Sequence, residues 1–224
     1  MKNSKALALG AACVALGSNA YGFIINGDFE LGGYNWFFVN GGVSGNLNGL
    51  LPYEGAYFGY AGTEPTLIGA AIDTTCVIDN TVLQFRYNFH TDETANDVPI
   101  GSPFDDKFDV RLIAQGGYSR MIAIDSVYTA VGRGDLLTTN MKPWDAGAGT
   151  PDYHASTGWR AFSTDVSDFV GLGVVNVQFL VSDAGDTLRK SGMGIDDIRL
   201  VPEPSTVAVF GVALAGVLAR RRRK

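Results

Sequence analysis

The strongest constraint on the fold is a set of short runs in which apolar and polar residues alternate. In Val82–Phe89, the apolar residues Leu83, Phe85, Tyr87 and Phe89 occupy every second position. A period of two places these side chains on one face of a β-strand. Long segments with the 3.6-residue period of an amphipathic helix are missing from the body of the chain. The pattern therefore predicts half-buried sheets rather than a helical bundle.

Similar runs recur between residues 21 and 200, separated by turn residues. The expected strands are Phe23–Ile25, Trp36–Val39, Ala56–Gly59, Thr66–Ile72, Val82–Phe89, Phe108–Ala114, Met121–Ile124, Trp159–Val166, Val174–Val181 and Gly194–Val201. Many short strands with no helix between them predict an all-β fold, namely one antiparallel β-sandwich of the jelly-roll type. The longest connections, 92–106 and 126–156, have the length at which loops usually carry function.

Residues 1–20 have the pattern of a secretory signal peptide, which would form a short helix. Lys2 and Lys5 supply its positive start, and Ala6–Gly17 is an apolar stretch too short to span a bilayer. Small residues just before Tyr21 predict cleavage by signal peptidase after Ala20. The alternative is a buried N-terminal helix. We expect export of a mature protein that begins at Tyr21.

The C-terminal segment 201–224 has three parts in a fixed order. Its first part is a Pro-Glu-Pro motif that ends the last expected strand, because proline stops strand pairing. The second part, Val207–Ala219, is uncharged and apolar, and we expect a transmembrane helix there although about 20 residues are usual. The last part is basic and should stay in the cytoplasm by the positive-inside rule. The residues of the motif and the basic end are Pro202, Glu203, Pro204, Arg220, Arg221, Arg222, Arg223 and Lys224.

This arrangement resembles the PEP-CTERM sorting signal of Gram-negative bacteria, in which a Pro-Glu-Pro motif precedes a transmembrane helix and an arginine-rich end. The resemblance implies transient anchoring in the inner membrane, recognition by an exosortase and processing near Pro202, Glu203 and Pro204. Proteins of this family are linked to exopolysaccharide production and to the cell surface or biofilm matrix. The signal predicts where the protein goes, and the function of the body must be read from residues 21–200.

The charge is distributed unevenly along the chain. All 224 residues together have a formal net charge of −6, but residues 21–202 contain 10 Lys and Arg against 22 Asp and Glu. A protein that binds nucleic acid needs a basic face, so we expect no nucleic-acid partner. An acidic domain also repels anionic polymers unless cations bridge the two.

Two motifs at the ends of the body carry a second resemblance. Asn26-Gly27-Asp28-Phe29-Glu30 and the closing run Gly194–Leu200 are similar to the first and last strands of galactose-binding-like jelly rolls, including several carbohydrate-binding module families. Those jelly rolls commonly hold a structural Ca²⁺ between these strands. The resemblance implies calcium ligands at Asp28, Glu30 and Asp196, and Ca²⁺ prefers oxygen ligands of this kind. The alternative is that these carboxylates are surface residues at strand ends.

Aromatic side chains are the expected platform for a sugar ring. Trp144 and Tyr153 lie in the long loop 126–156, with Asp145 and His154 as polar neighbours. A second set consists of Tyr53, Tyr57 and Tyr60 near Glu54. Burial is the expectation for five further aromatic residues, which are Trp36, Phe37, Phe38, Phe58 and Trp159.

Three smaller features have ordinary structural interpretations. Six acidic residues (Asp92, Glu93, Asp97, Asp105, Asp106 and Asp109) lack EF-hand spacing and are expected to form a solvated loop. The tripeptide Arg133-Gly134-Asp135 is expected to be a charged turn rather than an adhesion motif. Cys76 is the one cysteine left after signal removal, and we expect a buried free thiol.

The sequence lacks the common catalytic motifs Gly-x-Ser-x-Gly, His-Glu-x-x-His and the P-loop. We therefore expect a noncatalytic protein that binds glycan or forms part of an exopolysaccharide or biofilm matrix. Two alternatives remain open. One is a purely structural surface protein without a ligand. The other is a polysaccharide-active hydrolase or lyase, for which the sequence singles out no carboxylate pair.

Overall fold

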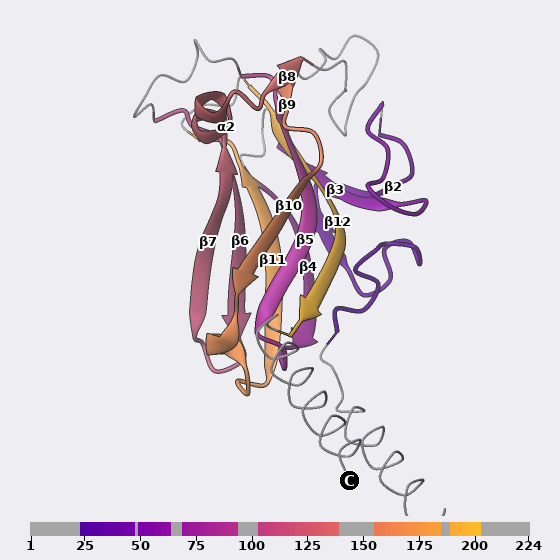
Figure 1. The fold of residues 1–224 in the computed structure, drawn as a ribbon, viewed down its shortest axis with the longest axis vertical. Helices are drawn as coiled ribbons and strands as arrows, with labels where there is room; N and C mark the ends of the chain where they lie inside the picture. The colour runs from indigo at the N-terminus through magenta and orange to yellow at the C-terminus, as the bar shows by residue number, and fades with distance from the viewer. Residues whose placement is uncertain are drawn as a thin grey trace, which may run out of the picture.

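The computed structural model describes residues 23–47, 49–63, 69–93, 103–138, 155–184 and 189–202. Within them the chain forms two antiparallel β-sheets that pack face to face (Figure 1). Successive strands repeatedly pass from one sheet to the other, as in a jelly roll. The all-β sandwich expected from the alternating sequence is confirmed.

The five-stranded sheet has the strand order β1-β4-β11-β6-β7. Its members are β1 (Phe37–Val39), β4 (Gly69–Val77), β11 (Val174–Ser182), β6 (Lys107–Ala114) and β7 (Ser119–Ser126). The seven-stranded sheet has the order β2-β3-β12-β5-β9-β8, and β10 also pairs with β5. Its members are β2 (Gly41–Ser44), β3 (Phe58–Gly62), β12 (Ser191–Val201), β5 (Val82–Thr91), β9 (Ala155–Ser156), β8 (Leu137–Thr138) and β10 (Arg160–Asp165).

The core lies between the sheets and follows the alternation of the strands. In β5, the residues Leu83, Phe85 and Phe89 are buried, as their spacing predicts. Phe85 meets Phe179 of β11 edge to face, with ring centroids 5.0 Å apart. Such an aromatic contact adds to the free energy gained by removing both rings from water.

Two local predictions are wrong. The run Phe23–Ile25 forms no strand. A helix, α2 (Val127–Arg133), interrupts the connection that was expected to lack one, and a 3₁₀ turn, η1 (Ser167–Phe169), follows β10. The helix is too short for a periodic pattern, but its ends have signals. Ser126 caps the first turn by accepting a hydrogen bond from the main-chain N–H of Thr129, and Gly134 ends the helix in the left-handed conformation (φ 70°).

The predicted terminal segments lie outside the described residues. These are the signal peptide with its cleavage site at Ala20, and the segment from Glu203 through the apolar run Val207–Ala219 to the basic end. In the part of the chain that the structure describes, no helix is long and apolar enough to cross a membrane. The last strand, β12, ends at Val201, directly before Pro202.

Candidate functional site

The outer face of the five-stranded sheet presents one side chain from each strand in a straight row. In β-strands every second residue faces outward, and the register aligns these residues across strands. Phe37 lies opposite Asp73, which lies opposite Gln178, followed by Arg111 and Met121 (this set is called the polar row below). At a strand spacing of about 4.8 Å, five strands extend the row over roughly 19 Å. The row therefore has the dimensions of a site for an extended ligand.

The chemistry changes along the polar row. Phe37 is an exposed ring at one edge, with 63% of its surface accessible. The carboxylate of Asp73 comes next and accepts a long hydrogen bond from the amide of Gln178 (3.4 Å). Arg111 is exposed on β6, and Met121 is exposed on β7. The row thus combines an apolar ring with acceptors and donors that suit hydroxyl groups.

A pocket of about 300 Å³ lies at the Phe37 end of the row. Its walls come from the edge strand β1, from β4 and from β11, and are formed by Asn35, Trp36, Phe37, Asp73, Thr74, Thr75 and Asn176. The Oδ1 atom of Asn176 is buried and has no hydrogen-bond partner among the described residues. Leaving a buried acceptor without a partner costs roughly 1–3 kcal/mol.

The expectation that Phe37 is buried is wrong, because its side chain is exposed. Along β1 the burial alternates, so Phe38 faces the core while Phe37 and Val39 face solvent. Trp36 lies just before the strand and is buried, with its ring centroid 6.3 Å from that of Phe179. Three consecutive aromatic residues cannot all face inward from an extended strand. The sequence shows the run but does not show which residue of it points outward.

Two of the three predicted calcium ligands, Glu30 and Asp196, contact the loop that connects β2 with β3. Asp196 on β12 accepts hydrogen bonds from the main-chain N–H groups of Tyr53 (3.0 Å) and Glu54 (3.2 Å). Glu30 accepts from the N–H groups of Ala56 (2.7 Å) and Tyr57 (3.0 Å). Asp28 is exposed, and its carboxylate accepts a long hydrogen bond from the N–H of Glu30 (3.4 Å). Asp196 and Glu30 thus fasten the loop 51–57 from two sides.

Burial dominates the environment of Asp196, which has no exposed surface. Removal from water raises the pKa of its carboxyl group to about 6, although hydrogen bonds from Glu54, Asp197 and Tyr53 act in the opposite direction. A β-bulge follows it, between Asp196 and Arg199. The bulge lets Asp196 face the outside of the sheet while Ile198 enters the core, and Ile198 donates a main-chain hydrogen bond to the carbonyl of Gly27 (2.9 Å).

These contacts do not form a cation cage. Among the described residues, no three His, Cys, Asp or Glu side chains come together as a group that could hold a metal ion. A Ca²⁺ ion at Asp196 would have to displace main-chain N–H groups, which repel a cation. Calcium binding by Asp28, Glu30 and Asp196 therefore stays a prediction from the sequence.

The aromatic residues near Glu54 divide into exposed and buried members. Tyr53 and Tyr57 are exposed, whereas Tyr60 is fully buried and stacks on His90, with ring centroids 5.4 Å apart. Arg86 lies over the ring of Tyr53, 4.4 Å from its centroid. Trp159 was expected in the core and is only partly buried, with its ring N–H donating to the carbonyl of Leu51 (2.9 Å).

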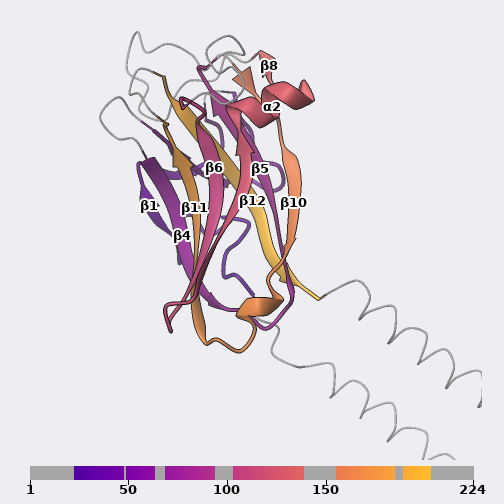
Figure 2. The same ribbon diagram turned by 90° about the vertical axis from the view of Figure 1, so that its left-hand side faces the viewer.

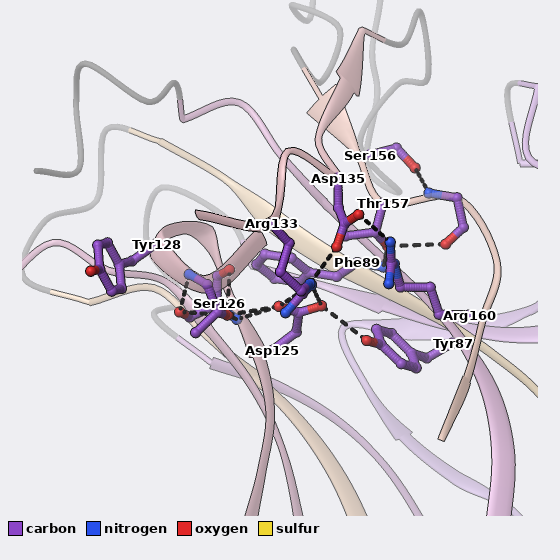
Figure 3. A network of polar contacts seen from close by, with 12 residues as sticks. Tyr87, Phe89, Asp125, Ser126, Tyr128, Arg133, Asp135, Ser156, Thr157 and Arg160 are labelled. Atoms are coloured by element: carbon purple, nitrogen blue, oxygen red, sulfur yellow. Dashed lines mark hydrogen bonds and ion pairs between the residues drawn. The ribbon is translucent and has the colours of Figure 1, made fainter. Parts of the chain in front are cut away.

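A network of polar contacts ties α2 to the seven-stranded sheet (Figure 3). The buried carboxylate of Asp125 accepts hydrogen bonds from Arg133 (2.7 and 2.9 Å) and from the hydroxyl of Tyr87 (3.0 Å). Arg133 also pairs with Asp135, which pairs in turn with Arg160 (2.5 Å). Both charged residues of the tripeptide 133–135 are thus engaged within the domain. The network joins α2 to β7, β5 and β10.

The predicted sugar-binding residues of that connection, Trp144, Asp145, Tyr153 and His154, lie outside the described residues. The same holds for Glu203, Pro204 and the arginines 220–223 of the sorting signal. The polar row, by contrast, was not predicted as a site. Most of its residues are far apart in sequence, and the strand register brings them together.

Two nucleophilic or basic side chains are buried. Burial lowers the pKa of His90 to about 3, so its imidazole is neutral at physiological pH. Burial, with a smaller effect from Asp79, raises the pKa of the Cys76 thiol to about 12. The expected buried thiol is confirmed. The expectation of a solvated acidic loop is wrong for Glu93 and Asp106, which are buried near the end of the sandwich.

Comparison with known proteins identifies the C-terminal segment. Residues 200–224 match the PEP-CTERM protein-sorting motif. This motif implies export and exosortase-mediated sorting to the cell surface. The match covers the end of the chain and does not extend into the sandwich. A search of curated proteins finds no match.

The sandwich is similar to solved carbohydrate-binding modules. TmCBM61 in complex with beta-1,4-galactotriose is 13% identical, with a TM-score of 0.45 over 82% of this chain and 100% of that one. CBM27-1 of Caldicellulosiruptor saccharolyticus in complex with mannohexaose is 13% identical, with a TM-score of 0.44 over 81% and 97%. The C-terminal family 22 module of Clostridium thermocellum Xyn10B is 13% identical, with a TM-score of 0.41 over 83% and 98%. These similarities do not assign a ligand or an activity to this chain.

Proposed function

We propose that this protein is exported, sorted by an exosortase and displayed at the cell surface, where the outer face of its five-stranded sheet binds a neutral glycan without cleaving it. The sorting motif at residues 200–224 supports the export and sorting. The polar row supports the binding. In this role the protein would hold polysaccharide at the surface or within an exopolysaccharide or biofilm matrix.

The polar row is the observation that carries the proposal. A sugar ring has apolar C–H faces and hydroxyl edges, and the row offers a partner for each. The exposed ring of Phe37 provides an apolar platform, and Asp73 and Gln178 provide hydrogen-bonding groups beside it. The outer face of the sheet also leaves room for neighbouring sugars of a chain. A site of this form suits an internal segment of a polysaccharide.

The charge of the domain favours a neutral glycan. Residues 21–202 contain 22 acidic and 10 basic residues, so a polyanion would be repelled at low salt. On the row itself, Asp73 and Arg111 carry opposite charges and lie on either side of Gln178. Neutral polysaccharides are therefore the first ligands to examine.

A glycan array probed with the mature protein tests the proposal, followed by titration calorimetry with the best ligand. Phe37→Ala and Asp73→Ala should each weaken binding about tenfold or more, which corresponds to about 1.4 kcal/mol. Tyr128→Ala is the matched control, because Tyr128 is an exposed aromatic residue on α2, away from the row. Binding that is unchanged by both row substitutions would contradict the assignment of the face.

The same preparation separates the two alternatives. A purely structural surface protein would retain no glycan on the array. A hydrolase or lyase would release new reducing ends from a polysaccharide during prolonged incubation. Retention of glycan without release of reducing ends is the result we expect.

A further inference from the structure

Exposed apolar side chains gather at one end of the sandwich, around η1 and the neighbouring turns. Between 42% and 52% of the surface of each is accessible. The five residues, called the apolar tip below, are Val77, Tyr118, Val170, Leu172 and Val174. Single exposed apolar residues are common, but five at the same end of a small domain indicate a surface that another phase or molecule covers.

The strand register places the apolar tip at the end where the last strand finishes. Val201 of β12 pairs with Val82, and Val82 also pairs with Asp165 at the end of β10. The chain continues from Asp165 through η1 to Val174, which pairs with Val77. Figure 2 shows β10 and β12 both finishing at the lower end of the sandwich, and α2 at the opposite end.

The chain that follows β12 fixes how far this end can lie from a bilayer. The apolar run begins at Val207, five residues after Pro202. A fully extended chain covers at most about 3.6 Å per residue, so these five residues reach roughly 18 Å. An apolar run of residues 207–219 would form a helix about 20 Å long, shorter than the roughly 30 Å hydrocarbon core. Such a mismatch draws the flanking residues toward the bilayer.

The local geometry presents apolar groups at the tip beside one ion pair and the exposed carboxylates of Asp79 and Asp165. Gly171 and Gly173 both have positive φ values (80° and 82°), which lets the turn hold Leu172 outward between them. Arg120 pairs with Asp168 at 2.8 Å, and Asp168 also accepts a hydrogen bond from the hydroxyl of Tyr118 (2.8 Å). A tyrosine at the edge of an apolar patch is typical of a membrane interface.

We propose that the apolar tip rests on the outer surface of a zwitterionic bilayer while the C-terminal segment anchors the protein, before the sorting enzyme acts. This inference rests on the proposed sorting function, because that segment holds the tip near the membrane. The strands of 8–11 residues then carry the opposite end, with α2, roughly 25–35 Å away from the lipid. The polar row stands on the side of the domain and stays accessible.

Depth-dependent fluorescence quenching tests the arrangement. The full chain, in a Cys13→Ser background, is inserted into phosphatidylcholine–phosphatidylethanolamine vesicles that contain spin-labelled lipid. A fluorophore is attached at Leu172→Cys, at Tyr128→Cys on α2 or at Val212→Cys in the apolar run. Cys76 is buried and its raised pKa keeps it unreactive.

We expect strong quenching at position 212, quenching at position 172 at least threefold above that at position 128, and little effect of salt. Quenching at 212 with equal signals at 172 and 128 would overturn the inference and leave the anchor intact. No quenching at 212 would overturn the anchor and this inference together. Neither result would affect glycan binding by the polar row, which is measured on the soluble mature protein.

Discussion

Among the described residues, the outer face of the five-stranded sheet is open, whereas much of the outer face of the seven-stranded sheet is covered by the chain itself. The loop between β2 and β3 folds over β3 and β12, and its residues Leu47 and Leu50 form a second core with Phe58 and Tyr60. Room for this loop comes from β12, where Gly192 and Gly194 lack side chains toward that face. One face therefore contributes a second core to the domain, whereas the other presents the polar row to solvent.

The two faces should differ most in the unfolding free energy that is lost when a phenylalanine on each face is replaced by alanine. Phe58 is fully buried in the second core and meets Trp159 edge to face at 5.7 Å. Phe58→Ala should cost about 3–5 kcal/mol of unfolding free energy in urea titrations, because it leaves a cavity. Phe37→Ala on the open face is the matched control and should stay within about 0.5 kcal/mol. Equal losses would show that the two faces do not differ.

On the covered face, Asp196 should make the stability of the protein depend on pH. Burial raises the pKa of Asp196 to about 6, so the folded state holds its proton more strongly than the unfolded state. The resulting stability is complete below pH about 4 and is lost as the pH rises through 6, by at most about 3 kcal/mol for two pKa units.

Chemical denaturation between pH 4 and 7 measures this step. Asp196→Asn cannot titrate at this position and should make the step smaller, and Asp109, whose pKa burial also raises, accounts for the remainder. A wild-type profile that matches that of Asp196→Asn would contradict the burial argument.

Replacing a glycine by alanine should destabilise the folded state more in β12 than in β4. A Cβ at position 192 would lie 2.5 Å from the ring of His90 and 2.8 Å from the hydroxyl of Tyr60. Gly192→Ala should therefore cost about 1–3 kcal/mol through overpacking. Gly69→Ala in the five-stranded sheet is the control, since its nearest neighbour would be the Val181 carbonyl at 3.8 Å. Thermal unfolding of both variants compares the two sites, and a similar loss at Gly69 would refute this explanation.

The smallest expected effect concerns calcium at Asp28, Glu30 and Asp196. A site filled at ten times its Kd stabilises the folded state by about 1.4 kcal/mol. In a domain of this size, that corresponds to roughly 3–5 °C in Tm. If calcium binds at these residues, as the sequence predicts, chelator lowers the Tm of the wild type by this amount and leaves Asp196→Ala unaffected. Superimposable melting curves with and without chelator would show that calcium does not stabilise the domain.

The sequence predicted the strands better than it predicted the site. The alternation in β5, β6 and β11 gave their positions to within one or two residues, because burial on one face leaves a period-two pattern. The alternating run of apolar and polar residues also showed which side of β5 faces the core. Helix α2 was not predicted, because seven residues are too few to show a helical period. Ser126 and Gly134 nevertheless mark its ends.

The polar row could not be predicted, because its members come from five strands, most of which are distant in sequence. Phe37, Asp73 and Gln178 meet only through the pairing of β1 with β4 and of β4 with β11. The expectation that Phe37 is buried was wrong for a related reason. Hydrophobicity marks a residue as a candidate for the core. Successive residues of a strand point to opposite faces, however, so its exact position in the strand determines whether its side chain faces the core or solvent.

Hydrogen–deuterium exchange of the mature protein with and without its best glycan tests the central claim most directly. We predict that the ligand slows exchange in peptides that cover β1, β4, β11 and β6, and that peptides from the loop 49–57 and from β12 do not change. Protection confined to the loop 49–57 and β12, with none on the five-stranded sheet, would place the ligand on the covered face and contradict the account.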